Sequence, residues 1–142
     1  MKPPVIVLDT NVIVSALITG QPHSPTCLIL DGMLAGQFTF LLSTEILSEY
    51  RRVLLRPKIQ KLHGLDEGEV DAILTEIVVN GVMRETLKVS RRAPEKGDDH
   101  LWALISIQPG TMLVTGDKLL IENPPDSATV LSPREFIELI EA

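Results

Sequence analysis

Four acidic residues are the side chains of this sequence best suited to chemistry, although they lie far apart along the chain: Asp9, Glu49, Asp99 and Asp117. Carboxylates gathered in one cleft repel one another and raise each other's pKa, so such a cluster costs free energy unless a cation compensates it. Carboxylate oxygens favour hard ions, and magnesium takes one or two carboxylates while keeping several waters, which suits phosphate substrates. The four residues together predict a site for Mg²⁺ or Mn²⁺.

Zinc is a poorer match, because it favours histidine and cysteine ligands. The sequence contains His23, His63 and His100 without a paired spacing, and Cys27 is its only cysteine. A lone cysteine excludes an intramolecular disulfide and a thiolate zinc cluster, and it fits a reducing cytoplasm. We expect Cys27 itself to belong to the core.

Each acid also has an ordinary structural interpretation. Asp9 could cap the helix that follows it, and Asp117, in the segment TGDK, could be a turn residue. One of the neighbours Asp98 and Asp99 could cap the next helix, so the sequence leaves open which of the two meets a metal. The prediction of a metal site therefore depends on the four acids together.

Similar alternatives exist for the residues around these acids. Glu49 could form an exposed ion pair with Arg51 or Arg52. Asn11 and Thr115 stand beside two of the acids and could orient a carboxylate or a water molecule. Ordinary capping and turn bonding explain Asn11 and Thr115 equally well.

Alternating strands and helices must position these residues. Short apolar or β-branched runs predict strands at residues 5–8, 38–42, 85–89, 111–115 and 128–131. Helical spacing and the capping residues Ser24, Ser43 and Ser132 predict helices at residues 12–18, 25–35, 44–55, 66–80 and 98–107 and after Ser132. Pro57 is expected to end the third of these helices. Parallel neighbours need long right-handed crossovers, so this order predicts an α/β fold with a parallel sheet and helices on both faces.

The predicted strands explain how distant acids could meet. In an open parallel sheet, functional groups collect beyond the carboxyl ends of the strands. Asp9 follows the first strand, and Glu49 lies on the second turn of the helix after the second strand. Asp99 opens the helix after the third strand, and Asp117 lies two residues beyond the fourth. All four could face one crevice.

Composition limits the remaining possibilities. A length of 142 residues and a hydrophobic content of 44% fit one domain over residues 1–142. The net charge of −6 has the wrong sign for binding nucleic acid by bulk electrostatics, but assigning four acids to a metal site reduces it to −2. No apolar stretch approaches the roughly 20 residues that span a bilayer, and polar residues at 9 and 11 interrupt the first apolar run. We expect a soluble, cytoplasmic protein that does not act at a membrane.

Several segments, taken in order, resemble a known family: VIVLDTNVIVSAL, LLSTEILSEYRRVLLRPKI, DDHLWAL, MLVTGDKLL and LSPREFIELI. Their succession is similar to the PIN domain, particularly to the bacterial and archaeal group assigned as toxins of toxin-antitoxin modules. The resemblance implies a three-layer α/β/α sandwich whose central five-stranded parallel sheet has the order 3-2-1-4-5. It also implies hydrolysis of RNA phosphodiester bonds with Mg²⁺ or Mn²⁺.

The resemblance also assigns residues and partners. The positions that match the family's catalytic residues are Asp9, Asn11, Glu49, Asp99, Thr115 and Asp117, and the four acids among them match its metal ligands. Members of this group often read DKDLL where this chain reads DKLLI, so a second acid after Asp117 is absent here. The family further implies an RNA substrate, an antitoxin protein as a partner, and a homodimer.

Basic residues could contact RNA or an acidic partner, although a solvated helix surface or loop is their ordinary role. The denser stretch contains Arg51, Arg52, Arg56, Lys58 and Lys61. A second set contains Lys118 and the loop residues Arg91, Arg92 and Lys96.

Three other classes of protein compete with a nuclease. A phosphoacceptor receiver domain would need paired acids after the first strand, where this chain reads DTN. A phosphoryl-transfer hydrolase with a nucleophilic aspartate would need a second aspartate at the position of Asn11. A catalytically weak PIN-fold module that binds RNA or a protein is the third alternative, and the presence of all four acids argues against it.

Overall fold

Five strands form one parallel sheet in the computed structural model, which describes residues 4–85, 99–124 and 129–141. The strands are β1 (Val5–Leu8), β2 (Thr39–Leu42), β3 (Val82–Met83), β4 (Met112–Val114) and β5 (Thr129–Leu131). Their order is β3-β2-β1-β4-β5, and every neighbouring pair is parallel. The expected order 3-2-1-4-5 is thus confirmed, with β1 at the centre of the sheet.

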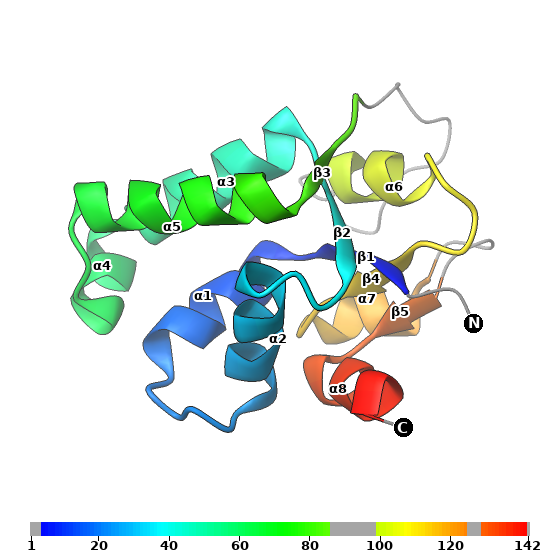
Figure 1. Cartoon of the computed structure of the whole chain (residues 1–142), viewed down its shortest axis with the longest axis horizontal. Coiled ribbons are helices and arrows are strands. Elements are labelled where there is room, and N and C mark those ends of the chain that lie inside the picture. The colour runs from blue at the N-terminus through cyan, green and yellow to red at the C-terminus, as the bar shows by residue number, and fades with distance from the viewer. Residues whose placement is uncertain (1–3, 86–98, 125–128, 142) are drawn as a thin grey trace.

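Helices connect the strands and follow the last one. They are α1 (Thr10–Ile18), α2 (Pro25–Leu34), α3 (Thr44–Leu54), α4 (Pro57–His63), α5 (Glu67–Asn80), α6 (Asp99–Ile105), α7 (Lys118–Glu122) and α8 (Pro133–Glu141). In Figure 1 the helices α1 to α5 lie to the left of the sheet and α6 to its right. The sheet is therefore covered by helices on both faces, as expected for a PIN-like α/β fold.

Serine and aspartate caps begin several helices where the sequence predicted them. The Ser24 hydroxyl accepts a hydrogen bond from the backbone N–H of Cys27 (3.3 Å), and Pro25 occupies the first turn of α2. The Ser43 hydroxyl caps α3 by accepting from the N–H of Ile46 (3.2 Å). Such caps satisfy backbone N–H groups that have no partner within the helix, so they fix where the chain leaves each strand.

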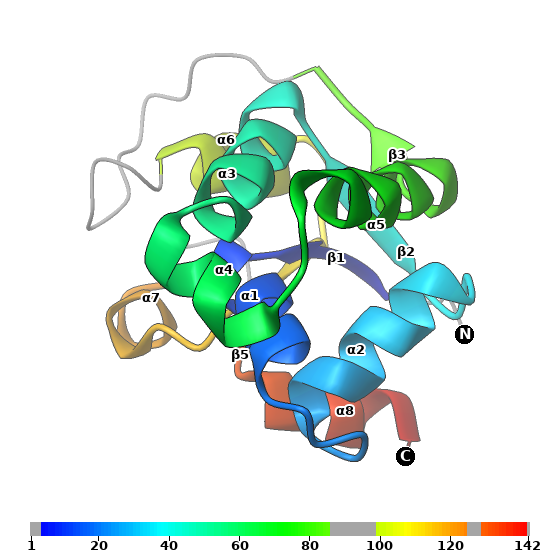
Figure 2. The ribbon, with the colours of Figure 1, turned by 90° about the vertical axis from the view of Figure 1, so that its left-hand side faces the viewer.

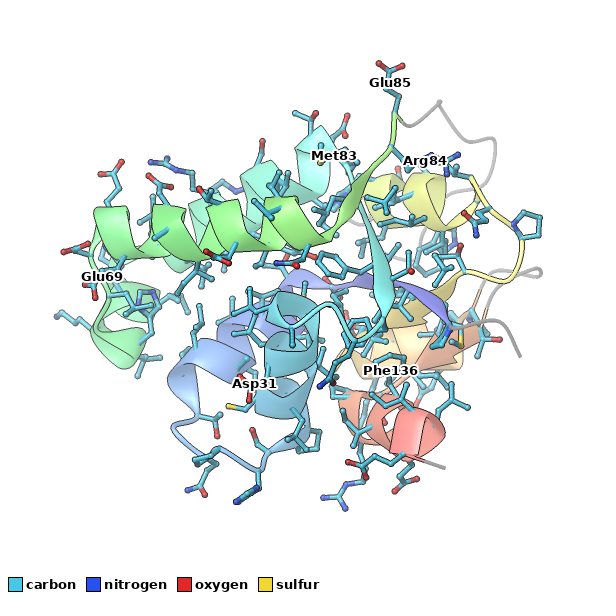
Figure 3. All side chains as sticks on the ribbon, in the orientation of Figure 1. Asp31, Glu69, Met83, Arg84, Glu85 and Phe136 are labelled. Atoms are coloured by element: carbon cyan, nitrogen blue, oxygen red, sulfur yellow. The ribbon has the colours of Figure 1, made fainter. Side chains whose placement is uncertain are left out.

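The core lies on both faces of the sheet, against the larger group of helices and against α6. Val7 and Leu8 of β1 and Leu41 and Leu42 of β2 are buried. Phe136 carries α8 onto this core, where its ring meets that of Phe38 edge to face at 5.2 Å between centroids (Figure 3). Burial of these apolar side chains is the main force that holds the layers together.

Three local details differ from the sequence prediction. The third strand is Val82–Met83 rather than 85–89, of which residues 86–89 lie outside the described residues. The helices α4 and α7 were not predicted; Pro57, expected only to end α3, opens α4 two residues after Leu55 closes α3. Cys27 is half-buried rather than in the core, and its thiol lies 3.2 Å from the carbonyl oxygen of Ala16.

Candidate metal centre

Asp9 joins the end of β1 to the start of α1. Its Oδ1 accepts a hydrogen bond from the backbone N–H of Thr10 at 2.7 Å, so it caps α1 as its ordinary interpretation predicted. Its Oδ2 accepts a second bond from the hydroxyl of Thr115, also at 2.7 Å. The residue is only 6% exposed, so its carboxylate is held at the bottom of the site by two separate parts of the chain.

Asn11 and Thr115 tie the turn after β4 to the first turn of α1. The Asn11 side-chain amide lies 3.3 Å from both Asp9 Oδ2 and Thr115 Oγ1. Its Oδ1 accepts from the backbone N–H of Gly116 at 3.0 Å, and Thr115 Oγ1 accepts from the N–H of Asp117 at 3.0 Å. Both residues therefore orient groups of the site, as one of their two interpretations proposed.

Glu49 reaches the same region from the middle of α3. Its Oε2 accepts a hydrogen bond from the hydroxyl of Thr10. Its Oε1 lies 3.5 Å from His100 Nε2 and 3.7 Å from a guanidinium nitrogen of Arg52. The side chain is 18% exposed, so the alternative of a fully exposed ion pair with Arg52 describes only part of its surroundings.

The two remaining acids open helices. Asp117 caps α7, and its Oδ1 accepts from the backbone N–H of Leu119 at 2.9 Å. Asp99 is the first residue of α6, which contacts β1, β4 and α3. Its neighbour Asp98 lies outside the described residues, so the choice between the two stays open. In Figure 2, the end of β1 that leads into α1 lies on the left of the molecule, with α3 and α6 above it and α7 below it.

A cleft of about 330 Å³ brings three of the four predicted acids together. It is lined by Asp9, Thr10, Asn11, Val14, Glu49, Val53, Arg56 and Asp117. Asp99 and Thr115 do not line this cleft. Thr115 nevertheless donates its hydroxyl to Asp9, which does line it. The cleft thus combines carboxylates from the ends of β1 and β4 and from α3.

A larger hollow of about 480 Å³ lies beside the start of α3. It is lined by Thr44, Glu45, Met83, Arg84 and Glu85, the last three of which are labelled in Figure 3. None of the four predicted acids lines it. We therefore place the candidate site in the smaller cleft, which is lined by Asp9, Glu49 and Asp117.

Burial and neighbouring charge both act on Asp9. Burial raises the pKa of its carboxyl, and the negative charges of Glu49 and Asp117 raise it further. Hydrogen bonds from Thr115 and Thr10 favour the ionised form and lower the pKa, but the net shift is upward. Burial also raises the pKa of the Tyr50 phenol, and the charges of Asp9 and Glu49 add to this shift. The site therefore concentrates negative charge in a poorly solvated place.

The donor set fits a divalent cation, although the described residues form no coordination cage in advance. Within residues 4–85, 99–124 and 129–141, no group of three His, Cys, Asp or Glu side chains is arranged to hold an ion. The carboxylates instead accept hydrogen bonds from Thr10, Thr115 and the Leu119 backbone. Hard oxygen donors with unfavourable mutual charge are nevertheless what Mg²⁺ or Mn²⁺ would compensate.

Sequence reasoning missed three residues that contact the acids or the backbone beside them. Thr10 donates to Glu49, and the buried Tyr50 donates its hydroxyl to the Leu8 carbonyl at 2.5 Å, just before Asp9. His100 faces Glu49, and both its ring nitrogens are buried without a hydrogen-bond partner in the part of the chain that is described. Their nearness in sequence to Asp9, Glu49 and Asp99 was the available signal.

Of the helices in the described residues, none is both long enough and apolar enough to cross a bilayer.

Comparison with known proteins identifies relatives of the whole fold. A family model described as PIN domain matches residues 5–119, a range that holds all six predicted site residues. An uncharacterized protein of Methanocaldococcus jannaschii is 30% identical over 146 aligned positions, which cover 96% of this chain and 91% of that protein.

Proposed function

Because this chain belongs to the PIN domain family, whose members are generally nucleases that use divalent metal ions, we propose that it is a Mg²⁺- or Mn²⁺-dependent ribonuclease. The observation that carries the proposal is the cleft lined by Asp9, Glu49 and Asp117. These acids come from three separate elements and have no common structural purpose, since capping explains only Asp9 and Asp117.

The proposed metal ligands are Asp9, Glu49, Asp99 and Asp117. A bound divalent cation would supply an acidified water and offset charge on the scissile phosphate. Thr115 and the Thr10 backbone hold the Asp9 carboxylate in one orientation, and Thr10 does the same for Glu49 through its hydroxyl. Asn11 fixes the turn that carries Asp117.

The wider biological role extends this proposal. We propose RNA as the substrate, an antitoxin protein as the partner, a homodimer as the assembly and the cytoplasm as the location. The resemblance to toxins of toxin-antitoxin modules supports these four statements. That residues 1–142 form a single domain likewise stays a prediction.

The test is cleavage of a mixed pool of single-stranded and hairpin RNA in the presence of manganese, magnesium or a chelator. We expect cleavage only with metal, and a loss of at least about a hundredfold in Asp9→Asn and Asp117→Asn. Asparagine is a good helix cap, so both variants keep the start of α1 and α7. Asp31→Asn is the matched control, because Asp31 is exposed on α2, outside the cleft (Figure 3).

A negative result would favour a different function. If the wild-type protein binds metal and RNA but leaves the RNA intact, a PIN-fold module that binds RNA or a protein partner becomes the better explanation. Equal cleavage by the wild type and both site variants would contradict the assignment of the acids.

A further inference from the structure

Arg56 is a positively charged residue in a cleft that is otherwise acidic. It lines the same 330 Å³ cleft as Asp9, Glu49 and Asp117, and it is exposed. In the described part of the chain, no carboxylate lies within ion-pair distance of its guanidinium. Its charge is therefore available to a ligand.

The neighbouring arginines on α3 are already engaged. Arg51 bonds to Asp71 at 2.8 Å and to Glu67 at 2.5 Å, which fastens α3 to α5. These bonds raise the pKa of the Arg51 guanidinium above its usual range. Arg52 lies 3.7 Å from Glu49. In the basic stretch, Arg51 and Arg52 are thus paired with carboxylates, whereas Arg56 lines the cleft without such a partner in the described residues.

The backbone holds Arg56 in a defined place at the corner between α3 and α4. Its N–H donates to the Val53 carbonyl at 3.2 Å, and its carbonyl accepts from the N–H of Gln60 at 2.8 Å. Pro57 follows directly, which favours the extended conformation that Arg56 adopts, with φ −62° and ψ 134°. Because this backbone is already fixed, it need not be ordered when the side chain binds a ligand.

We propose that Arg56 binds a backbone phosphate of the RNA, next to the one that is cleaved, and so sets the position of the strand in the cleft. A guanidinium presents two parallel N–H groups that match two phosphate oxygens, and it stays charged at every physiological pH. An acidic cleft repels RNA outside the metal site, so a cation on its wall gives the strand a favourable path. This inference rests on the proposed function.

The experiment measures binding of a fluorescently labelled single-stranded RNA of mixed sequence by anisotropy, in magnesium, at salt concentrations from about 50 to about 200 mM. Every protein carries Asp117→Asn to suppress cleavage. Arg56→Gln should weaken binding about tenfold and reduce the slope of log affinity against log salt by about 0.7 to 1, the value for one lost phosphate contact. Lys61→Gln removes the same charge from an exposed residue of α4 outside the cleft; it is the matched control and should change neither quantity.

Kinetics and metal binding separate a substrate contact from a structural role. With Asp117 restored, Arg56→Gln should raise KM about tenfold and change kcat less than about threefold, since it removes binding shared by the ground and transition states. Arg56→Lys should recover part of the affinity, because it keeps the charge but not the two parallel donors. The rise in Tm on adding manganese should be the same in Arg56→Gln as in the wild type.

Different failures have different meanings. Unchanged RNA affinity and salt slope in Arg56→Gln, or a lost manganese effect on its Tm, would overturn the proposal for Arg56. If Arg56→Gln weakens binding while the wild type cleaves nothing, the contact stands and the nuclease function fails. If the wild type binds no RNA, both are wrong.

Discussion

At the scale of single residues, Asp9 combines two opposing roles. Its carboxylate caps α1 and accepts the Thr115 hydroxyl, which stabilises the folded chain. Its burial near Glu49 and Asp117 raises its pKa, which shows that the ionised form is disfavoured where it stands. A carboxyl group in such a place suits a cation ligand better than a cap, because asparagine or serine would cap the helix without the cost of burying a carboxylate.

We predict that Asp9→Asn raises the Tm of the metal-free protein by a few degrees and abolishes the further rise that manganese produces in the wild type. The substitution removes the buried charge and keeps the cap. Differential scanning fluorimetry with chelator and with manganese measures both effects. Asp31→Asn, on the exposed side of α2, should match the wild type in both conditions.

The stabilisation by Asp9→Asn should also depend on pH. Because the pKa of Asp9 is raised on folding, its ionisation lowers the free energy of unfolding of the metal-free protein. This loss is full above the folded pKa and disappears as pH falls through it towards the ordinary value of 3.8. Urea unfolding should therefore show a larger advantage of the variant at about pH 7 than at about pH 4. The exposed Asp71 and Glu135, whose pKa values are lowered, are common to both proteins and cancel in the difference. An advantage that grows towards acid would contradict this assignment.

At the scale of elements, α3 serves the fold and the site together. Glu49 faces the cleft, whereas the next residue, Tyr50, is buried and bonds to the last carbonyl of β1. On its outer surface, Arg51 fastens the helix to α5. A shift of α3 would therefore move Glu49 relative to Asp9, so the helix packing determines the geometry of the site.

The passage from α5 into β3 depends on a glycine for space rather than for backbone freedom. Gly81 has φ −96°, which any residue can adopt, but a Cβ there would lie 2.6 Å from Leu42 Cδ1 and from Phe40 Cε2. We predict that Gly81→Ala lowers the free energy of unfolding by about 1–3 kcal/mol, measured in urea, because the core strand β2 must give way.

Gly68→Ala provides the comparison. The added Cβ would meet only Asp66 Oδ1 at 3.4 Å, at the exposed start of α5. Alanine is the better helix former, so this variant should be neutral or more stable by up to about 1 kcal/mol. Equal stability of the two variants would mean that the contacts of Gly81 with β2 are not restrictive.

At the scale of the whole molecule, the net charge affects the binding of RNA, and the exposed apolar surface affects assembly. The net charge of −6 opposes the binding of RNA, so the proposed affinity would have to come from local features such as the proposed cation and Arg56. Val79, Val82 and Met83 are exposed apolar residues around the edge strand β3. Exposed apolar edges are common where chains associate, so they are compatible with the expected homodimer.

We predict a homodimer at micromolar concentration. Light scattering coupled to size exclusion should give twice the mass of the chain, and the mass should not change when chelator is added, because the expected assembly does not depend on the metal site. A monomeric mass over the whole concentration range would remove this expectation.

The sequence alone predicts most of the strands and helices, and it identifies the three acids that line the cleft. Local rules located β1, β2, β4 and β5 and the caps Ser24, Ser43 and Ser132, because apolar runs and capping groups act over a few residues. The rule that functional groups collect beyond parallel strands then selected four acids, and Asp9, Glu49 and Asp117 among them line one cleft, whereas Asp99 does not. The order of the sheet came from the family resemblance.

Only the tertiary structure shows which other side chains face these acids or share their cleft. The third strand begins at Val82 because its partner is β2, and such pairing is not encoded in local propensity. His100 of α6 faces Glu49 of α3. Arg56 lies in the cleft without a carboxylate partner in the described residues, whereas Arg51 is paired with Asp71. Contacts between residues distant in sequence depend on how helices pack on the sheet, and that packing is fixed by the whole core at once.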